Sequence, residues 1–327
     1  MYEEVKEIKA EDLDLKNFIG EKIAEISSKV GDGYAINALS GGVDSSTVTM
    51  FGYKALGDRL KTYFIDTGLM RENEPQQVVS LFEGLGVSVE IVNVKEQFFY
   101  SLKGIKDPEE KREAITQTFY KDIFAQLVRE SRSRYLLQGT ILTDINETSA
   151  GIKRQHNVFE QIGIDPEKKF GYKIIEPLKQ LRKEGVIKVA EALGLPESIY
   201  NRMPFPGPGL SVRVIGEVTP ERIETVRRAT SIVEEIIGNE SLVPKPFQYM
   251  AILHEDKVTG IRYGKRDYGL QIEMRCWDSI DARIATPTRL PYHTLDKLAE
   301  RITKEVPGVV SVTYNITGKP HSTIEAV

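Results

Sequence analysis

A glycine-rich turn over residues 40–46 combines the residue types best suited to chemistry in this chain. Its members are Ser40, Gly41, Gly42, Val43, Asp44, Ser45 and Ser46. Paired glycines allow backbone N–H groups to approach an anion without interference from a Cβ atom. The start of the helix-like stretch that follows adds N–H donors without partners and a partial positive charge. The turn is therefore predicted to bind phosphate groups.

The carboxylate of Asp44 distinguishes this turn from the common phosphate-binding loop of nucleoside triphosphatases. The G-x-x-x-x-G-K-[ST] pattern is missing, because no lysine follows the glycines. A carboxylate would repel bound phosphate unless a divalent cation lay between them, and Mg²⁺ is held by one or two carboxylates together with phosphate oxygens. Asp44 is therefore predicted to be a Mg²⁺ ligand. The alternative is a structural Gly-Gly turn with a capping aspartate.

Alternating strand-like and helix-like segments are expected to position the turn. Apolar runs predict strands at 34–39, 62–65, 87–92 and 134–137, and helical spacing predicts helices at 14–30, 74–85 and 112–131. Such alternation predicts an α/β fold with a doubly wound, mostly parallel sheet that is covered by helices on both faces. Ligands bind beyond the carboxyl ends of the strands in these sheets, which is where the turn is expected.

A change in composition near residue 203 predicts a domain boundary. The segment 203–209 reads Met-Pro-Phe-Pro-Gly-Pro-Gly, and its prolines have fixed φ angles and no N–H donor. We assign residues 1–203 to a first domain and 204–327 to a second. In the second domain, helices are predicted from Thr219-Pro220-Glu221 onward and near 295–306, and strands at 249–253, 270–277 and 309–316. These elements predict a smaller α+β domain.

Composition limits the classes of function. The chain has 327 residues, of which 40% are hydrophobic, and its formal net charge of -4 provides no basic field for a nucleic-acid backbone. No apolar run reaches the roughly 20 residues of a membrane helix, and the start Met1-Tyr2-Glu3-Glu4 is unlike a signal peptide. We therefore expect a cytoplasmic protein that binds neither nucleic acid nor membrane. Cys276, the only cysteine, excludes a disulfide within the chain and is predicted to lie inside a strand.

The turn resembles the signature loop of the N-type ATP pyrophosphatases, which split ATP between its α and β phosphates. Further segments resemble the GMP synthetases, and they extend over nearly the whole chain. They are Ile65 to Arg71, Gln138-Gly139-Thr140, Ile152-Lys153 with His156-Asn157-Val158, Glu176-Pro177-Leu178, Pro204 to Leu210, and Gly318 to Glu325. The resemblance implies an adenine nucleotide alpha-hydrolase-like fold followed by an α+β dimerisation domain, and hence a homodimer.

The resemblance implies a two-step amination of xanthosine 5'-monophosphate (XMP). The xanthine O2 attacks the α-phosphate of ATP, which gives an adenylyl-XMP intermediate and pyrophosphate, and ammonia then displaces AMP at C2 to yield GMP. An amide-like oxygen leaves poorly whereas AMP leaves readily. ATP therefore supplies the activation, and the protein positions the reactants and neutralises charge.

The resemblance also implies an ATP site. The turn at 40–46 would hold the β and γ phosphates, with Asp44 on Mg²⁺. The adenosine would lie against Phe64, Ile65, Asp66, Gln138, Gly139 and Thr140. Asp144 and Glu147, one helical turn apart, either complete the metal site or act as a helix cap and a solvated carboxylate.

A catalytic lysine and an XMP site are implied as well. Lys153, in the lid-like stretch 150–163, would stabilise charge on the α-phosphate, the alternative being a surface lysine. His156 would add a donor in the same stretch. The implied XMP-binding residues are Arg71, Lys319, Thr323, Ile324 and Glu325.

The chain departs from the family pattern at two places. Arg154-Gln155 and Phe159-Glu160 replace the usual small residue, histidine and glycines of the lid, and the tail ends in Ala326-Val327 instead of Trp-Glu. Any role of the terminal Trp-Glu pair is therefore absent in this chain or supplied by other residues.

A separate glutamine amidotransferase subunit is expected to supply the ammonia. The chain begins almost directly with the synthetase part, and its single cysteine lacks the setting of a glutaminase nucleophile. The alternative functions are an NAD synthetase, a tRNA-modifying enzyme that adenylates a base, and a sensor that binds ATP without turnover. XMP-dependent release of AMP and pyrophosphate distinguishes these functions.

Overall fold

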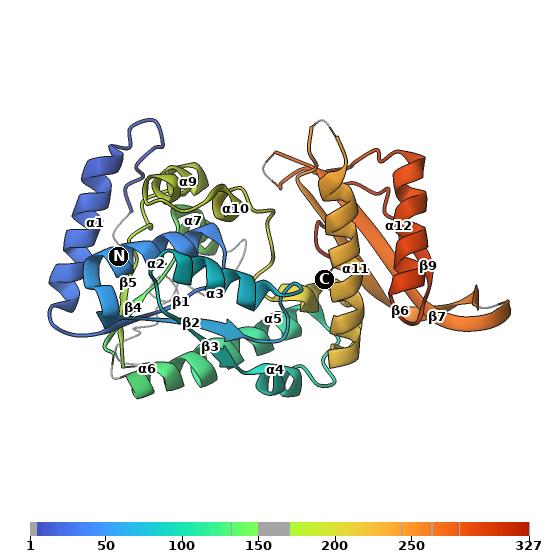
Figure 1. Cartoon of the computed structure of the whole chain (residues 1–327), viewed down its shortest axis with the longest axis horizontal. Coiled ribbons are helices and arrows are strands. Elements are labelled where there is room, and N and C mark those ends of the chain that lie inside the picture. The colour runs from blue at the N-terminus through green and yellow to red at the C-terminus, as the bar shows by residue number, and fades with distance from the viewer. Residues whose placement is uncertain are drawn as a thin grey trace. The chain divides into compact units, whose positions relative to one another are not determined.

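The computed structural model describes residues 5–131, 133–149, 171–242, 244–262, 264–280 and 282–326. The chain forms two compact units, which are described separately below (Figure 1). The first unit consists of Met1–Asp66, Pro75–Asn93 and Phe119–Arg202, and the second of Thr67–Glu74, Val94–Thr118 and Met203–Val327. Two short segments from the first half of the sequence thus belong to the second unit. Among the described residues, no helix is long and apolar enough to cross a membrane.

A five-stranded parallel sheet forms the centre of the first unit. Its strands are β1 (Ala35–Ala38), β2 (Leu60–Asp66), β3 (Val89–Asn93), β4 (Tyr135–Leu137) and β5 (Lys173–Ile175), in the order β3-β2-β1-β4-β5. The register pairs Ala35 with Leu60 on one side of β1 and with Tyr135 on the other. The sheet is therefore wound outward in both directions from β1, and the predicted doubly wound α/β fold is confirmed. The switch point, where such sheets bind ligands, lies between β1 and β4.

Helices cover both faces of this sheet. In Figure 1, α2 and α3 lie on one side of the sheet and α6 on the other. The helical elements that belong wholly or mainly to this unit are α1 (Leu15–Val30), α2 (Val43–Leu56), η1 (Gly57–Arg59), α3 (Glu74–Gly84), η2 (Thr118–Phe124), α6 (Ala125–Ser131), α7 (Leu142–Ser149), α9 (Lys183–Ala192) and α10 (Glu197–Tyr200). The predicted helix at 14–30 is confirmed as α1. Asp14 caps it by accepting a hydrogen bond from the Asn17 backbone N–H, and Phe18 packs edge-on against Phe51 of α2.

The predicted single helix at 112–131 is wrong in one respect. The helical run there consists of α5 (Pro108–Gln117), the π-helical η2 and α6. The run passes from the second unit to the first at Thr118 and Phe119. A π-helical segment shifts the faces of the flanking α-helices relative to each other, so residues before and after it can pack into different cores. Apolar spacing alone did not reveal this shift.

Close packing and a buried polar bridge hold α2 on the sheet. A Cβ atom on Gly52 would lie 2.5 Å from Leu137 Cδ1 of β4 and 2.9 Å from Leu60 Cδ2 of β2, so only glycine lets the helix approach this closely. In addition, the Asn37 side chain of β1 donates to Thr49 Oγ1 of α2 (2.6 Å) and accepts from Thr62 Oγ1 of β2 (2.8 Å). Because these buried polar groups bond to one another, they hold the helix on the sheet at no cost in unsatisfied hydrogen bonds. The N-terminus of α2 is thereby placed against the ends of β1 and β4.

The second unit is built on a mostly antiparallel sheet. The long hairpin of β6 (Gln248–Arg262) and β7 (Lys265–Asp278) is joined by β8 (Thr286–Pro287), antiparallel to β7, and by β9 (Val309–Tyr314), parallel to β7. Helices α11 (Pro220–Asn239) and α12 (Tyr292–Glu305) pack against this sheet in Figure 1. Within the described ranges, the other helical elements of this unit are α4 (Lys95–Ser101), α5 and η4 (Gly209–Arg213). The predicted smaller α+β unit is confirmed, although β6 and β7 extend farther than their apolar runs indicated.

Helix α11 has the cap and the buried face that its sequence predicted. Thr219 accepts a hydrogen bond from the Arg222 backbone N–H, and Pro220 occupies the first helical position. The predicted inner face is buried, and each apolar side chain on it contributes about 1.5–3 kcal/mol of hydrophobic free energy. Its members are Ile223, Val226, Val233 and Ile237.

The segment Thr67–Glu74 is held in the second unit by hydrogen bonds to its backbone carbonyl oxygens. Arg227 of α11 donates to the carbonyl oxygens of Gly68 (2.5 Å) and Met70 (3.0 Å), and the Leu210 N–H donates to the carbonyl of Leu69 (2.7 Å). These contacts belong to tertiary structure and have no counterpart in the local sequence pattern. They explain why residues directly after β2 belong to the second unit.

Candidate active site

The turn between β1 and α2 is closed by its own hydroxyl groups. Ser45 Oγ lies 2.9 Å from Ser40 Oγ, accepts a hydrogen bond from the Ser40 N–H (3.1 Å) and donates to the Gly42 carbonyl (3.1 Å). These hydrogen bonds join Ser40 and Gly42 to the first turn of α2.

The two glycines of this turn have different roles, and only Gly41 is required by geometry. Gly41 has a φ of +77°, and a Cβ atom there would lie 2.7 Å from Val78 Cγ2 and 2.9 Å from Arg202 Nη1. Gly42 is the N-cap of α2 and has no side chain to cap the helix. The first-turn N–H groups of α2 therefore keep their donors for an external anion.

A buried hydroxyl adds to this donor set. Ser46 Oγ is buried and has no hydrogen-bond partner among the described residues. A buried hydroxyl without a partner is unfavourable, so a ligand that accepted its proton would remove the penalty. The residues of the turn thus fit the phosphate group that the sequence predicted.

The segment Gln138–Thr140 lies against the same turn. A Cβ atom on Gly139 would be 3.1 Å from Asp44 C and 3.1 Å from Ser45 N, so this glycine brings the end of β4 to the first turn of α2. The Gln138 N–H donates to the Ile175 carbonyl of β5 (3.0 Å), and the Gln138 amide donates to Thr140 Oγ1 (3.0 Å). Residues 40–46 and 138–140, far apart in sequence, are therefore neighbours at the switch point of the sheet.

The end of β2 lies at the same edge of the sheet. Ala38, the last residue of β1, pairs with Tyr63, so Phe64, Ile65 and Asp66 continue β2 beside the turn. All three are buried. Their position agrees with that of the predicted adenosine contacts, whose role stays a prediction.

Asp44 is paired with a cation that the sequence analysis did not identify. Lys183 Nζ lies 2.9 Å from Asp44 Oδ1 and 2.7 Å from Oδ2. Lys183 is the first residue of α9 and is 51% exposed, whereas Asp44 is 30% exposed. No motif signals this lysine, because it approaches Asp44 only through the packing of α9 beside α2.

Arg202 adds a second positive charge next to the turn. Its Nη1 donates to the Gly41 carbonyl (3.3 Å). Lys183 and Arg202 thus place two cationic side chains at the turn, next to the carboxylate of Asp44. The turn therefore combines N–H donors, hydroxyl groups and cationic side chains, which suit an anionic ligand.

Of the other predicted catalytic and metal-binding residues, only Asp144 has a described side chain. Asp144 Oδ2 accepts a hydrogen bond from the Ile141 N–H (3.1 Å), which is the helix-terminal role considered as its alternative. Glu147 lies in α7, and its side chain is outside the described residues. In the described part of the chain, no group of three or more histidine, cysteine, aspartate or glutamate side chains is arranged to hold a metal ion. Lys153 and His156 lie outside the described residues, so their predicted roles stay predictions.

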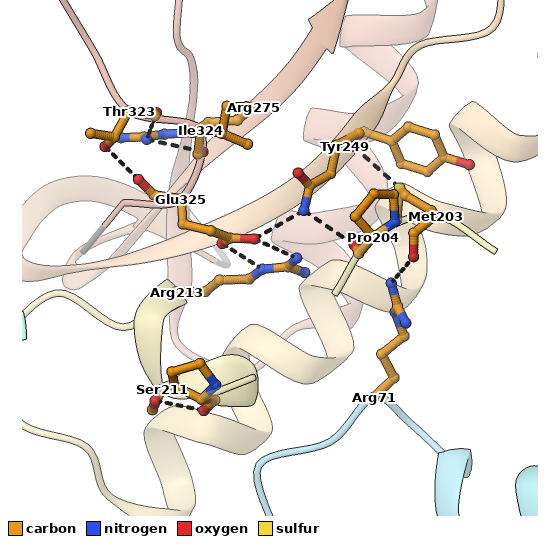
Figure 2. Close-up of polar contacts among 12 residues, drawn as sticks. Arg71, Met203, Pro204, Ser211, Arg213, Tyr249, Arg275, Thr323, Ile324 and Glu325 are labelled. Atoms are coloured by element: carbon orange, nitrogen blue, oxygen red, sulfur yellow. Dashed lines mark hydrogen bonds and ion pairs between the residues drawn. The ribbon is translucent and has the colours of Figure 1, made fainter. Parts of the chain in front are cut away.

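The second unit holds a cluster around Arg71, which Figure 2 shows. Arg71 Nε donates to Glu234 Oε1 of α11 (2.8 Å), and Arg71 Nη2 donates to the Met203 carbonyl (3.4 Å). Its guanidinium carbon lies 4.2 Å from the centre of the Phe205 ring. The proline-glycine segment that begins at Met203 thus lies against the Arg71 guanidinium.

A buried ion pair joins Arg213, which follows the proline-glycine segment, to Glu325 of the C-terminal tail. Arg213 Nε and Nη2 donate to the two carboxylate oxygens of Glu325, each at 3.1 Å (Figure 2). Arg213 is fully buried, and its guanidinium carbon lies 5.1 Å from the centre of the Phe205 ring. Gln248 of β6 donates to Glu325 Oε1 (2.9 Å) and to the Pro204 carbonyl (3.2 Å). Arg213 and Gln248 had not been singled out from the sequence, although Arg213 follows the proline-glycine segment by only a few residues.

The tail itself is fixed through its backbone. Arg275 Nη1 of β7 donates to the carbonyl oxygens of Thr323 (2.8 Å) and Ile324 (3.3 Å), as Figure 2 shows, and Trp277 Nε1 also donates to the Ile324 carbonyl (3.2 Å). The contacts of Lys319 are with another segment, because its Nζ donates to the Ala282 carbonyl (2.8 Å). Glu325 thus lies beside Arg213, whose guanidinium is close to the Phe205 ring. Lys319 has a different partner, the Ala282 carbonyl.

Comparisons with known proteins agree with this two-part architecture. Residues 13–208 match the family model described as NAD synthase, and residues 234–326 match the model described as GMP synthase C terminal domain. Among solved structures, an NH3-dependent NAD synthetase from Campylobacter jejuni in complex with the nitrate ion is a more distant match. It is 14% identical, with a TM-score of 0.46, over 60% of this chain and 80% of that chain.

Curated relatives match over nearly their whole length. The B subunit of GMP synthase [glutamine-hydrolyzing] from Thermococcus kodakarensis is 47% identical over 95% of this chain and 99% of its own. The proteins of the same name from Methanopyrus kandleri and Archaeoglobus fulgidus are 45% and 46% identical, over 95% and 96% of this chain and 99% of their own.

The doubly wound sheet and the glycine turn at its switch point define an ATP-pyrophosphatase-type ligase domain of the NAD synthase class. The smaller unit narrows this class, since it carries the GMP synthase C-terminal domain. The chain belongs to the family of GMP synthase B subunits.

Proposed function

We propose that this chain is the synthetase subunit of a GMP synthase, which aminates XMP at the expense of ATP and yields GMP, AMP and pyrophosphate. Membership of the family over 95% of the chain supports this function. The single observation that carries the ATP chemistry is the turn at 40–46, where uncapped N–H groups, a buried hydroxyl and a carboxylate occur without the lysine of γ-phosphate-transferring loops. Such a site binds the outer phosphates of ATP and leaves the α-phosphate open to attack.

The chemistry divides into two balanced steps. The xanthine O2 bonds to the α-phosphorus while the bond to the β-phosphate oxygen breaks, and pyrophosphate leaves. Ammonia then adds at C2, loses a proton, and expels AMP with the electron pair of the C2–O bond. The uncapped N–H groups at the start of α2 would hold the leaving pyrophosphate, and the Ser46 hydroxyl would add a donor.

Asp44 is proposed as a ligand of Mg²⁺. The donor set of the turn fits this metal, because a carboxylate amid phosphate-binding N–H groups repels the ligand unless a cation accompanies it. When bound, Mg²⁺ would supply neutralisation of the charge on the departing pyrophosphate. Asp144, Glu147 and Lys153 remain proposals for the same site.

For XMP we propose the cluster of the second unit. Arg71 offers a planar guanidinium that suits phosphate or carbonyl oxygens. Glu325 presents a carboxylate whose place is set by Arg213 and Gln248, and the backbone of Thr323 and Ile324 is held by Arg275. Lys319 is the remaining proposed contact. In this proposal, residues 1–203 act as the ATP-pyrophosphatase domain and 204–327 contribute to XMP binding.

A separate glutamine amidotransferase subunit is proposed as the source of ammonia. The chain's own cysteine does not fit that role, because Cys276 is buried in β7 and burial raises the pKa of its thiol to about 12. We also propose a homodimer through the second unit, where the exposed Ile280, Ile284 and Ile316 offer apolar surface. Light scattering at micromolar concentration tests this state, and a monomer alone would contradict it.

One assay tests the proposed function. Purified chain is incubated with ATP, Mg²⁺, XMP and ammonium, and the release of AMP, pyrophosphate and GMP is measured. The same reaction with glutamine in place of ammonium is expected to yield no GMP until the amidotransferase subunit is added. Deamido-NAD in place of XMP is the matched control for the NAD synthase class. Products that consist of ADP and orthophosphate, or turnover with deamido-NAD alone, would contradict the proposal.

A further inference from the structure

One face of strand β7 carries a row of polar side chains that ends at the C-terminal tail. Successive side chains alternate between the faces of a strand, so Glu273, Arg275 and Trp277 project to the same face. Arg275 Nη1 donates to the carbonyl oxygens of Thr323 (2.8 Å) and Ile324 (3.3 Å), as Figure 2 shows. Trp277 Nε1 also donates to the Ile324 carbonyl (3.2 Å). The proposed function assigns no role to the groups that hold Arg275 itself.

The Glu273 carboxylate joins Arg275 to a histidine. Its Oε1 accepts a hydrogen bond from Arg275 Nε (2.5 Å), and its Oε2 lies 3.0 Å from His254 Nε2. The side chains of Arg275 and Glu273 are only 9% and 16% exposed, so water screens their attraction weakly. Burial raises the pKa of Glu273, but the hydrogen bonds from His254 and Arg275 lower it further, and the pKa lies below its ordinary value. Glu273 therefore remains a charged acceptor for both partners.

We propose that His254 and Glu273 are positioning residues for XMP binding, and that they act through Arg275. His254 holds the Glu273 carboxylate in the orientation that presents Oε1 to Arg275 Nε. Arg275, held at that nitrogen, presents Nη1 to the carbonyl oxygens of Thr323 and Ile324. This inference rests on the proposed function, which assigns the tail to XMP. It adds to that function two residues that act without contacting the substrate.

The shape of the arginine side chain explains why this support matters. The guanidinium is planar, so a hydrogen bond at Nε fixes the plane in which the other donors of Arg275 lie. Fixing this plane before XMP arrives removes the entropy cost of ordering the side chain during binding. The tail carbonyls are therefore held by a donor that is already in place.

The backbone around His254 keeps its ring beside Glu273. The register of β6 against β7 shifts between Leu253 and Lys257, so His254 is the first residue after the regular pairing ends. Its carbonyl oxygen accepts a hydrogen bond from Arg222 Nη2 of α11 (3.2 Å). The histidine is thus held by β6 on one side and by α11 on the other, while its ring nitrogen is directed to the carboxylate.

Variants at two histidines of the second unit test the positioning role. His254→Leu removes the ring nitrogens, and His254→Gln returns an amide donor. His293→Leu is the matched control, since His293 is exposed on α12. The KM values for XMP and ATP and kcat are measured with ammonium and saturating Mg²⁺. The emission of Trp277, the only tryptophan of the chain, adds a readout without substrate, because its indole is hydrogen-bonded to the tail.

The effect is expected in the binding of one substrate only. His254→Leu should raise the KM for XMP by about three- to tenfold, because a hydrogen bond to a charged group is lost. The value of kcat and the KM for ATP should stay within about twofold, because the tail binds XMP alike in the ground state and the transition state. The emission of Trp277 should shift to longer wavelength as water reaches the indole. Glu273→Gln, which removes the charge and keeps the shape, should act in the same direction. His254→Gln should restore the KM for XMP and the emission, and His293→Leu should change neither.

A double-variant cycle tests whether His254 acts through Arg275. Arg275→Lys keeps the positive charge but loses the planar set of donors, and the KM for XMP should rise by about tenfold or more. Adding His254→Leu to Arg275→Lys should raise the KM no further, because the route from the histidine to the tail is already broken. Additive effects would overturn the proposal.

Other outcomes also overturn it and are distinguishable from failure of the proposed function. If His254→Leu matches His293→Leu in KM and emission, the histidine has no part in XMP binding. If kcat and both KM values change together, or the emission shifts while the KM for XMP does not, His254 supports the fold and not the substrate. Each of these results leaves XMP-dependent release of AMP and pyrophosphate by the unaltered chain intact. Absence of that release would instead contradict the proposed function, and the effect on XMP with it.

Discussion

The glycine turn of the first unit and the tail cluster of the second unit each contain a cation paired with a carboxylate, but in opposite environments. Lys183 and Asp44 are 51% and 30% exposed, whereas Arg213 is fully buried and Glu325 is 18% exposed. The first pair lies at the uncapped start of a helix, and the second is enclosed by Phe205, Gln248 and the Pro204 backbone.

The difference shows that an ion pair can serve two purposes. A solvent-exposed pair is weak and can be replaced by a ligand. A buried pair is expensive to break, because either charge left alone in the interior is unsatisfied. The pair at the turn can therefore be broken at little cost, whereas the pair in the tail cluster fixes the position of Glu325.

The largest expected effect comes from breaking the buried pair. Arg213→Met leaves the Glu325 carboxylate without its bidentate partner, and the free energy of unfolding should fall by about 3–5 kcal/mol. Urea denaturation followed by circular dichroism measures this loss. The double variant Arg213→Met with Glu325→Leu should lose less than the sum of the two single variants. Additive losses would show that the pair is not coupled.

The next effect concerns activity at the turn. Asp44→Asn preserves the shape of the side chain but removes its charge, and XMP-dependent release of pyrophosphate should fall by about 10²-fold or more. Steady-state kinetics with ammonium at saturating Mg²⁺ provide the measurement. Unchanged thermal unfolding would confirm that the loss is chemical. A rate within threefold of the unaltered chain would remove Asp44 from the site.

A pH effect tests whether the core of the second unit is closed to water. Burial raises the pKa of Cys276 to about 12, so the folded state binds the thiol proton more tightly than the unfolded state. The contribution of this group to stability is complete below the unfolded pKa near 9 and is lost as pH rises toward 12. Between these values the free energy of unfolding should fall by up to about 1.4 kcal/mol per pH unit more steeply in the unaltered chain than in Cys276→Ala. Equal slopes would indicate a hydrated thiol.

The smallest expected effect completes the comparison. Lys183→Met breaks the exposed pair at the turn, and the free energy of unfolding should change by less than about 1 kcal/mol. The same urea titration as for Arg213→Met gives the value, and Lys188→Met, at another exposed lysine of α9, is the control. A loss as large as that of the buried pair would mean that Lys183 supports the fold, and the contrast between the two regions would disappear.

Much of the fold was predictable from local patterns. Helical spacing predicted α1 and the buried face of α11, and apolar runs predicted β1 to β4. The alternation of these strands with helices predicted a parallel sheet, and the structure supplied the strand order. Strand β5 was missed because Lys173–Ile175 is too short for a periodic signal. The outer halves of β6 and β7 were missed because their exposed residues are mostly polar and charged.

The proposed site was predictable only in part, for a related reason. Residues 40–46 and 138–140 carry recognisable motifs, and the structure brings them together at the switch point. Lys183, Arg202, Arg213 and Gln248 carry no motif of their own. They reach Asp44, Gly41 and Glu325 through contacts between elements far apart in the chain.

The sequence by itself determined the alternation of strands and helices, the glycine turn and the family, because these depend on periodicity, on backbone conformations that only glycine adopts, and on motifs. Tertiary structure alone decided which charges face the turn and the tail, and which short segments join the second unit. The physical reason is the separation along the chain over which each interaction acts. Periodicity and turn chemistry act over a few residues, whereas ion pairs join side chains that are 139 and 112 positions apart.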